Sequence, residues 1–240
     1  MCEVFVIGTK EEDFNEDYFE RGLECGISCY QNYRWIPELT IPMAMTIIDY
    51  LKLKPEHTIL DFGCAKGYLV KALRLLKRQA WGYDISQYAI SRCDPDVRDY
   101  CFLDGEIGPR PRSFDFIIAK DVFEHIEANG LGLVLSGLNS EKLFAVIPLG
   151  DGKVYRAPVN NCDRTHRICA DEHWWIDAFE KGGWQIEDFR FKIEGIKDHY
   201  YEKFPEAHGF FLLKNTNLKE EKEGQFRRLR VHRGKRTPEG

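Results

Sequence analysis

Two acids and two glycines stand at spacings that suit the binding of an adenosine-like ligand. An apolar run ends at Asp61, Gly63 and Gly67 follow four residues apart, and Asp84 comes 21 residues after Gly63. A glycine turn lets a ligand approach the backbone closely. A carboxylate at the end of the next strand can accept hydrogen bonds from both ribose hydroxyls. The pattern predicts a nucleotide-like ligand.

The glycine turn lacks the residues that wrap a pyrophosphate or a phosphate chain. A dinucleotide fingerprint needs glycine at its first, third and sixth positions, but Ala65 and Tyr68 occupy the last two. A P-loop fails as well, because Tyr68 stands where Gly-Lys-Ser/Thr would begin. An adenosine ligand without a pyrophosphate, and with a charged amino-acid end, suits what remains.

Four later residues, Cys162, His166, Cys169 and His173, are of types that bind zinc. Their spacing, C-x3-H-x2-C-x3-H, lacks the paired Cys-x2-Cys hook of common zinc modules. We therefore expect no metal site.

Alternating apolar runs and helical patterns must position these residues. The predicted strands are 57–62, 79–84, 100–104, 114–121, 143–149, 184–193 and 208–214. The predicted helices start at Thr40, after Gly67, at Ser86, near Val122 and at 171. Such alternation forms a mostly parallel sheet covered on both faces. The last two strands have no helix between them, so one is expected to run antiparallel at the sheet edge.

Composition narrows the class of protein. The chain has 240 residues, 43% of them hydrophobic, and a net charge of -5, which disfavours a generic nucleic-acid binder. No apolar run approaches the roughly 20 residues that cross a bilayer. The N-terminal stretch does not read as a signal peptide, and the eight cysteines are scattered, so a cytoplasmic protein with reduced thiols is expected.

Five ordered motifs resemble those of the class I S-adenosylmethionine-dependent methyltransferases. ILDFGCAKG, GYDIS and FLDG are similar to the first three motifs of that family, and FDFIIAKDVFEHI is similar to its fourth strand and the following helix. DRTH and HWWIDAFEKGGW resemble the late loop and helix of small-molecule members. The resemblance covers roughly residues 40–215.

The resemblance implies an α/β fold of Rossmann-like, doubly wound type. A seven-stranded, mostly parallel sheet with one antiparallel edge strand is expected, together with an N-terminal helical cap. The corresponding division is a cap at 1–39, a methyltransferase core at 40–216 and a basic tail at 217–240, which composition predicts to be mobile. Within the cap, Tyr30 and Tyr33 are candidates to close over the cofactor, or alternatively to pack on the core.

The resemblance also implies S-adenosylmethionine as the cofactor. Asp61 would lie below the methionine end, Asp84 would hold the ribose, and Ile85 would pack on the adenine. Asp104 would accept the adenine amino group, although an ordinary turn residue is the alternative. The backbone of Lys120 would face the methionine end. The full set is Asp61, Gly63, Cys64, Ala65, Gly67, Asp84, Ile85, Asp104, Gly105 and Lys120.

Ala65 departs from the family pattern, because it replaces the middle glycine of the first motif. A positive φ at an alanine costs about 1 kcal/mol. We expect cofactor binding to survive this change.

The acceptor of the methyl group is predicted less sharply. The segment AKDVF lacks the Asn/Asp-Pro-Pro-Tyr/Phe of enzymes that act on planar amino groups, and it has no Pro-Cys for pyrimidine carbons. A small-molecule acceptor is expected, for example a sugar or nucleotide-sugar hydroxyl. The alternatives are an RNA or protein methyltransferase that uses the basic tail, and a non-catalytic cofactor-binding module. Neither a membrane nor a nucleic acid is the expected partner, and the sequence does not indicate the oligomeric state.

A hydroxyl acceptor needs a base, and His166 in the loop at 150–170 is the first candidate. Its alternative is to order the loop through hydrogen bonds. Asp163 is expected to orient His166 or to act itself, unless it only starts a turn. His125 is expected to be structural, on a helix that packs against the sheet.

Overall fold

The apolar runs of the sequence pair into a single sheet in the computed structural model, which describes residues 10–106 and 110–217. The strands are β1 Thr58–Phe62, β2 Gln79–Asp84, β3 Cys101–Leu103, β4 Phe114–Lys120, β5 Ser140–Pro148, β6 Trp184–Arg190 and β7 His208–Asn215. Apart from Asn217, the predicted tail lies outside the described residues.

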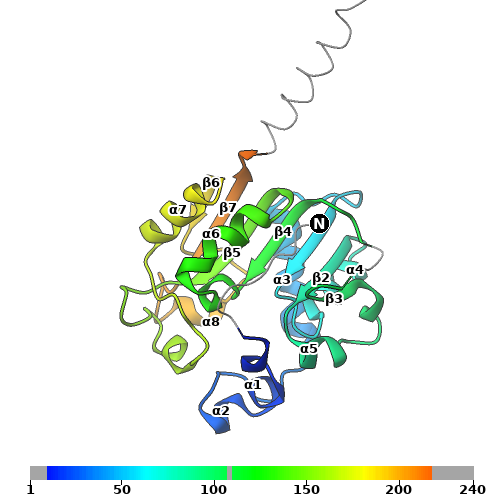
Figure 1. The fold of residues 1–240 in the computed structure, drawn as a ribbon. Helices are drawn as coiled ribbons and strands as arrows, with labels where there is room; N and C mark the ends of the chain where they lie inside the picture. The colour runs from blue at the N-terminus through cyan, green and yellow to red at the C-terminus, as the bar shows by residue number, and fades with distance from the viewer. Residues whose placement is uncertain (1–9, 107–109, 218–240) are drawn as a thin grey trace, which may run out of the picture.

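The sheet has the order β3-β2-β1-β4-β5-β7-β6. Strands β1 to β5 run parallel, and β7 pairs antiparallel with both β5 and β6 (Figure 1). The predicted seven-stranded, mostly parallel fold is confirmed. The antiparallel strand is β7, which lies one position in from the edge and has β6 outside it. A short connection suffices between antiparallel neighbours, whereas a parallel pair needs a long crossover.

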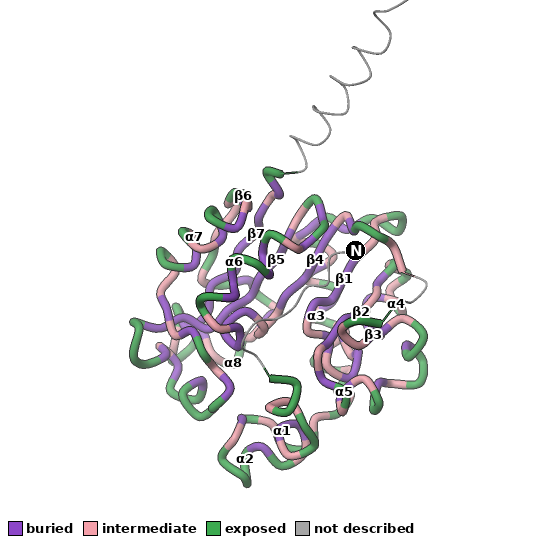
Figure 2. The backbone as a smooth tube through the Cα atoms, in the orientation of Figure 1, coloured by how far each residue is buried: buried purple, intermediate pink, exposed green. Residues whose placement is uncertain are grey.

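Helices cover both faces of the sheet. They are α1 Glu16–Glu20, α2 Gly22–Cys25, α3 Pro37–Tyr50, α4 Tyr68–Leu75, α5 Gln87–Ser91, α6 Ala128–Gly137, α7 Glu172–Lys181 and α8 Asp198–Tyr201. Helices α6 and α7 contribute to one apolar cluster with the sheet, while α3 and α4 contribute to another. The strands between these clusters are buried along most of their length, except for the edge strand β6 (Figure 2).

Helix ends follow local chemistry. The Ser86 side chain accepts from the Ala89 N–H and begins α5, as predicted. The predicted start at Thr40 is wrong, because Pro37 fits the first turn and α3 begins there. None of the helices in the described ranges combines the length and apolarity that crossing a bilayer requires.

The segment after β4 differs from the predicted helix starting near Val122. A 3-10 helix at Phe123–His125 comes first, and α6 begins only at Ala128. The chain turns sharply at the end of β4, where Asp121 has a φ of 57°. This turn brings the side chains after β4 to the carboxyl end of the sheet.

The N-terminal segment forms the predicted cap of short helices and loops. It comprises a 3-10 helix at Glu11–Asp13 and helices α1 and α2. These helices lie beyond the end of the sheet in Figure 1. An aromatic cluster holds the cap, in which Phe19 stacks on Tyr88 with ring centroids 6.1 Å apart. A buried ion pair between Lys66 and Glu20 ties the cap to the glycine turn.

Candidate active site

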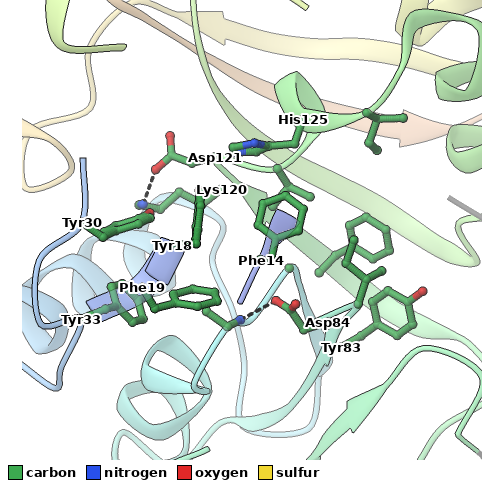
Figure 3. Close-up of a pocket in the computed structure, with 16 residues that line it drawn as sticks. Phe14, Tyr18, Phe19, Tyr30, Tyr33, Tyr83, Asp84, Lys120, Asp121 and His125 are labelled. Carbon is green, nitrogen blue, oxygen red and sulfur yellow. Dashed lines mark hydrogen bonds and ion pairs between the residues drawn. The ribbon is translucent and has the colours of Figure 1, made fainter. Parts of the chain in front are cut away.

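A cavity of about 120 Å³, called the first cavity below, lies at the carboxyl ends of β1, β2 and β4 beneath the cap (Figure 3). Its walls are formed by Phe14, Tyr18, Phe19, Tyr30, Tyr33, Phe62, Gly63, Ala65, Tyr83, Asp84, Ile85, Lys120, Asp121, Val122, His125 and Ile126. Parallel pairing causes this convergence, because Phe62 lies beside Tyr83, and Asp61 lies beside Ile118. The carboxyl edge of such a sheet is where ligands bind in open α/β folds.

The glycine turn is fastened to β2 by its own backbone. The N–H groups of Gly63 and Cys64 donate to the Tyr83 carbonyl at 2.8 and 3.0 Å. Gly63 has a φ of 81°, and a Cβ there would approach Val122 Cγ2 to 2.5 Å. Glycine is therefore required for both conformation and space. Ala65 has a φ of 49°, the positive value anticipated from the sequence.

Asp84 stands on the cavity wall with only 8% of its surface exposed. Its Oδ2 accepts from the Ala65 N–H at 2.7 Å and its Oδ1 from the Ser86 N–H at 2.8 Å. Burial raises its pKa to about 6, although these two donors act to lower it. A carboxylate has about four acceptor positions, so about two remain for a ligand.

Asp61 and Lys120 meet at the junction with a second cavity. Burial raises the pKa of Asp61 to about 7, against the attraction of Lys120. The Lys120 side chain lines both cavities and pairs with Asp121 at 2.6 Å (Figure 3). The sequence prediction considered only the backbone of Lys120, so this half-buried side-chain ammonium is an addition.

The predicted adenine contacts are only partly assembled in the described residues. Ile85 lines the first cavity together with Phe14, which the sequence prediction did not include. Asp104 and Gly105 do not line either described cavity. The Asp104 N–H donates to the Asp84 carbonyl at 3.0 Å, which fits a turn after the short strand β3.

The second cavity, of about 480 Å³, continues from the first. Both are lined by Tyr18, Tyr30, Tyr33, Gly63, Lys120, Asp121 and His125. The second cavity adds Asp61, Cys64, Arg34, Glu124, Asn160, Asp163, His166, Lys197, His199 and Tyr200, among others. It is large enough to hold a small molecule beside a ligand in the first cavity.

His166 lies in this second cavity, where Nδ1 is 2.9 Å from the Asn160 carbonyl. A carbonyl can only accept, so Nδ1 carries the proton and Nε2 the lone pair. Burial lowers the pKa of His166, against the attraction of Asp163. The sequence offered Asp163 as the residue that orients His166, but the hydrogen bond of the ring is made to the Asn160 backbone carbonyl.

Asp163 has partners other than His166. Its Oδ1 accepts from the Thr165 hydroxyl at 2.6 Å and from the Thr165 N–H at 2.9 Å. Its Oδ2 accepts from the Tyr18 hydroxyl at 3.1 Å. Asp163 thus joins the late loop to the cap.

His125 lies on the 3-10 helix after β4 and lines both cavities, rather than packing from a regular helix. Its Nδ1 is 2.8 Å from Thr165 Oγ1, and its ring meets that of His166 edge to face with centroids 4.7 Å apart. Burial and the neighbouring His166 lower its pKa to about 4.

Asp121, Glu124 and Lys197 line the second cavity but were not among the predicted site residues. Lys197 and Lys120 both pair with Asp121, at 2.7 and 2.6 Å. Burial alone would raise the pKa of Asp121, but the two ammonium groups hold it below its usual range. Glu124 is fully buried, and neither of its carboxyl oxygens has a hydrogen-bond partner among the described residues. The run Asp121 to His125 directly after β4 was the available sequence signal.

The potential metal ligands that gather in the described residues differ from the zinc set considered above. Glu124, His125 and His166 each offer one atom, and these atoms lie within 4.8 Å of one another. Of the zinc set, only His166 is in this group.

Comparison with known proteins adds a family to this geometry. Residues 40–133 match the model of a family described as a methyltransferase domain. The matched segment includes the glycine turn, Asp84 and the run after β4, whereas Asp163 and His166 lie outside it. A search of curated proteins gave no match.

Solved structures share the fold at low identity. A chain of the complex between the Haloferax volcanii Trm112 methyltransferase activator and a methyltransferase has a TM-score of 0.57 at 11% identity, over 75% of this chain and 91% of that chain. An S-adenosylmethionine-dependent methyltransferase of Clostridium acetobutylicum has a TM-score of 0.51 at 15% identity, over 73% and 92%. Mitomycin 7-O-methyltransferase has a TM-score of 0.53 at 14% identity, over 74% and 54%.

The likeness to these structures concerns the fold, while the matched family concerns the activity. Together with the motifs, they confirm the resemblance drawn from the sequence. The chain contains a methyltransferase domain, matched over residues 40–133, in the fold of the class I S-adenosylmethionine-dependent methyltransferases, and S-adenosylmethionine is its cofactor.

Proposed function

We propose that this enzyme transfers the methyl group of S-adenosylmethionine to a hydroxyl of a small molecule, with a sugar or nucleotide-sugar as the leading class. The observation that carries the proposal is the second cavity, which continues from the first and is lined by aromatic rings and polar groups. Aromatic faces together with hydrogen-bonding groups suit a polar ring.

In this proposal the cofactor spans the junction of the two cavities. Asp84 holds the ribose, Ile85 and Phe14 flank the adenine, and Asp61 binds the ammonium of the methionine end. The burial of both acids supports this assignment, because a ligand that carries positive charge or donates further hydrogen bonds would offset the cost of burying them.

The remaining cofactor contacts are proposed from the glycine turn and its neighbours. Gly63, Cys64, Ala65 and Gly67 provide backbone room. Lys120 lies at the methionine end, where its side chain lines both cavities. Asp104 and Gly105 stay proposals for the adenine edge.

Bound S-adenosylmethionine would supply its sulfonium methyl group for in-line displacement by the acceptor oxygen and would leave as a neutral thioether. The enzyme contributes alignment and exclusion of water. The hydroxyl proton would pass to Nε2 of His166, which carries the lone pair, while Asp163 holds the loop in place through Thr165.

Two unpaired polar groups in the second cavity bear on the acceptor. The Glu124 carboxyl oxygens and the Asn160 side-chain N–H have no hydrogen-bond partner within the described ranges. Buried polar groups are costly without partners, so a ligand that supplies both donors and acceptors is favoured. Sugar hydroxyls do both.

The RNA or protein acceptor remains the alternative. The name of the mitomycin 7-O-methyltransferase gives a small-molecule acceptor, whereas that of the Haloferax volcanii complex gives a methyltransferase activator and no acceptor, so these neighbours do not decide between the two classes. The cap residues Tyr18 and Tyr30 help to line the cavity, which supports an acceptor of limited size. The cytoplasmic location expected from the scattered cysteines is part of this proposal.

An acceptor screen tests the function. Purified protein is incubated with S-adenosylmethionine and separate sets of sugars, nucleotide-sugars, small phenols, RNA and peptides, and release of S-adenosylhomocysteine is measured. Turnover with a sugar set supports the proposal. Turnover with RNA or peptide alone would replace it, and cofactor binding without turnover in any set would favour the non-catalytic module.

A further inference from the structure

Glu124, His125 and His166 form a cluster of unlike donors on the wall of the second cavity. Glu124 and His125 come from the 3-10 helix after β4, and His166 comes from the late loop. One potential ligand atom of each lies within 4.8 Å of the others. Two segments about forty residues apart are therefore needed to bring these donors together.

The hydrogen bonds of both histidines define which ring nitrogen carries a lone pair. His166 Nδ1 donates to the Asn160 carbonyl. The Thr165 hydroxyl donates to Asp163 and thus accepts from His125 Nδ1. In both neutral rings the lone pair is consequently on Nε2. Oxygen partners on the far nitrogen are typical of histidines that bind metal ions.

Glu124 supplies an independent observation. It is fully buried and lines the second cavity, and both of its carboxyl oxygens lack a hydrogen-bond partner among the described residues. A buried carboxyl without a donor is rare and points to a missing partner, such as an ion.

We propose that Glu124, His125 and His166 bind one divalent first-row transition-metal ion in the acceptor cavity. Two imidazoles and one carboxylate suit Mn²⁺, Fe²⁺ or Zn²⁺, and they leave coordination positions open for ligand oxygens. The sequence expectation of no metal would then be wrong, and the ligands would differ from the zinc set by two of three residues.

The metal site deepens the proposed function and rests on it for the role of the ion. Next to the methyl donor, an acceptor oxygen could occupy an open coordination position. His166 has a single lone pair, so in the metal-bound enzyme it is a ligand and not the base. Metal binding therefore decides between the two roles.

Manganese is the probe of choice, because the chain has eight cysteines and softer ions such as Zn²⁺ also bind thiolates. The full chain is titrated with Mn²⁺ alone, and free Mn²⁺ is followed by electron paramagnetic resonance. One site per chain is expected. Glu124→Gln and His166→Ala should each weaken it at least about tenfold, and Thr165→Val, which removes the hydroxyl bonded to His125 Nδ1, should weaken it by a comparable or smaller factor.

The exposed His173 provides the matched control, because it belongs to the alternative zinc set and lies outside the cluster. His173→Ala should bind Mn²⁺ like the unchanged chain. Absence of Mn²⁺ binding by the folded chain, or equal binding by His166→Ala, would overturn the site. The half-buried position of His166 makes this second variant informative if Glu124→Gln does not fold.

Binding of S-adenosylhomocysteine is measured by calorimetry on the same samples. A chain that binds this product but not Mn²⁺ disproves the metal site and leaves the proposed function standing. A chain that binds Mn²⁺ at the cluster but never methylates an acceptor retains the site and contradicts the proposed function.

Discussion

The two cavities of this enzyme differ in how their polar groups are satisfied. On the cofactor side, both Asp84 oxygens accept backbone N–H groups, and the glycine turn is bonded to β2. On the acceptor side, Glu124 and the Asn160 amide have side-chain atoms without partners in the described part of the chain. The first cavity, proposed for the cofactor, is organised largely by the fold itself, although the buried Tyr83 hydroxyl on its wall also has no hydrogen-bond partner among the described residues. The second cavity, proposed for the acceptor, has a carboxyl group and an amide whose partners a ligand or ion would supply.

The difference extends to where the residues come from. The wall of the first cavity is built from the ends of β1, β2 and β4, the turns after them and the cap. The acceptor wall joins the cap, the segment after β4, the late loop and the segment before α8. A preformed site loses little entropy on binding, while a site with unpaired groups gains more from a matching ligand. The acceptor side is expected to determine specificity.

The largest effect is expected on the acceptor side. His166→Ala should lower kcat about 100-fold, because a proton acceptor contributes about 10² to 10⁴ in rate, and loss of a metal ligand would also impair the reaction. The affinity for S-adenosylmethionine should change by less than about threefold, since His166 is not among the residues lining the first cavity. Steady-state turnover and cofactor titration measure the two quantities.

The pH dependence sharpens this prediction. Because burial lowers the pKa of His166, its free base should persist below the usual histidine range, and the rate should fall only at more acidic pH. Unchanged activity of the folded His166→Ala variant would remove it from the mechanism. Loss of cofactor binding in this variant would instead mean that the two cavities are energetically coupled.

On the cofactor side, Asp84→Ala should weaken S-adenosylhomocysteine at least tenfold. Charged hydrogen bonds are worth about 1.5 to 3 kcal/mol each, and Asp84 is proposed to accept two from the ribose. The variant also frees the Ala65 and Ser86 N–H groups, so thermal unfolding must be measured alongside calorimetry. Equal affinity in a folded variant would exclude Asp84 from ribose binding.

Acid should weaken cofactor binding by protonating the same residue. The pKa of Asp84 in the empty site is about 6 because of burial. Its carboxylate is the better acceptor, so binding must expel a proton below that pH, and Asp84 alone should lower the affinity for S-adenosylhomocysteine about tenfold from pH 7 to pH 5, in addition to any contribution from Asp61. Asp84→Asn should lose this part of the dependence. Asp61, with a pKa near 7, is expected to account for what remains.

The smallest effect is expected at Ala65. Glycine would relieve the positive φ of 49° but would add freedom to the unfolded chain. Ala65→Gly should therefore alter the unfolding free energy by less than about 1 kcal/mol and cofactor affinity by less than about threefold. A large gain in affinity would mean that the alanine methyl group obstructs the ligand, which would make the cofactor cavity less preformed than described.

Much of the fold was predictable from short-range patterns in the sequence. Strands, the Ser86 cap and the glycine turn depend on periodicity and on φ requirements within a few residues, and these were predicted correctly. The position of β7 inside the edge depends on pairing between distant strands, which no local pattern encodes. The split helix after β4 likewise follows from the turn at Asp121, whose charge is held by two lysines from separate segments.

The sequence by itself determined the cofactor, because the glycine turn and the acid at the end of β2 follow neighbouring parallel strands. Their separation along the chain was therefore enough to predict that they lie close together. Only the tertiary structure decided the acceptor wall. Glu124, His125 and His166 meet because the late loop folds back onto the segment after β4, where the Arg167 N–H donates to the Glu124 carbonyl at 2.7 Å. Such contacts between distant segments result from packing of the whole chain, so residue types alone could nominate His166 but could not identify its neighbours.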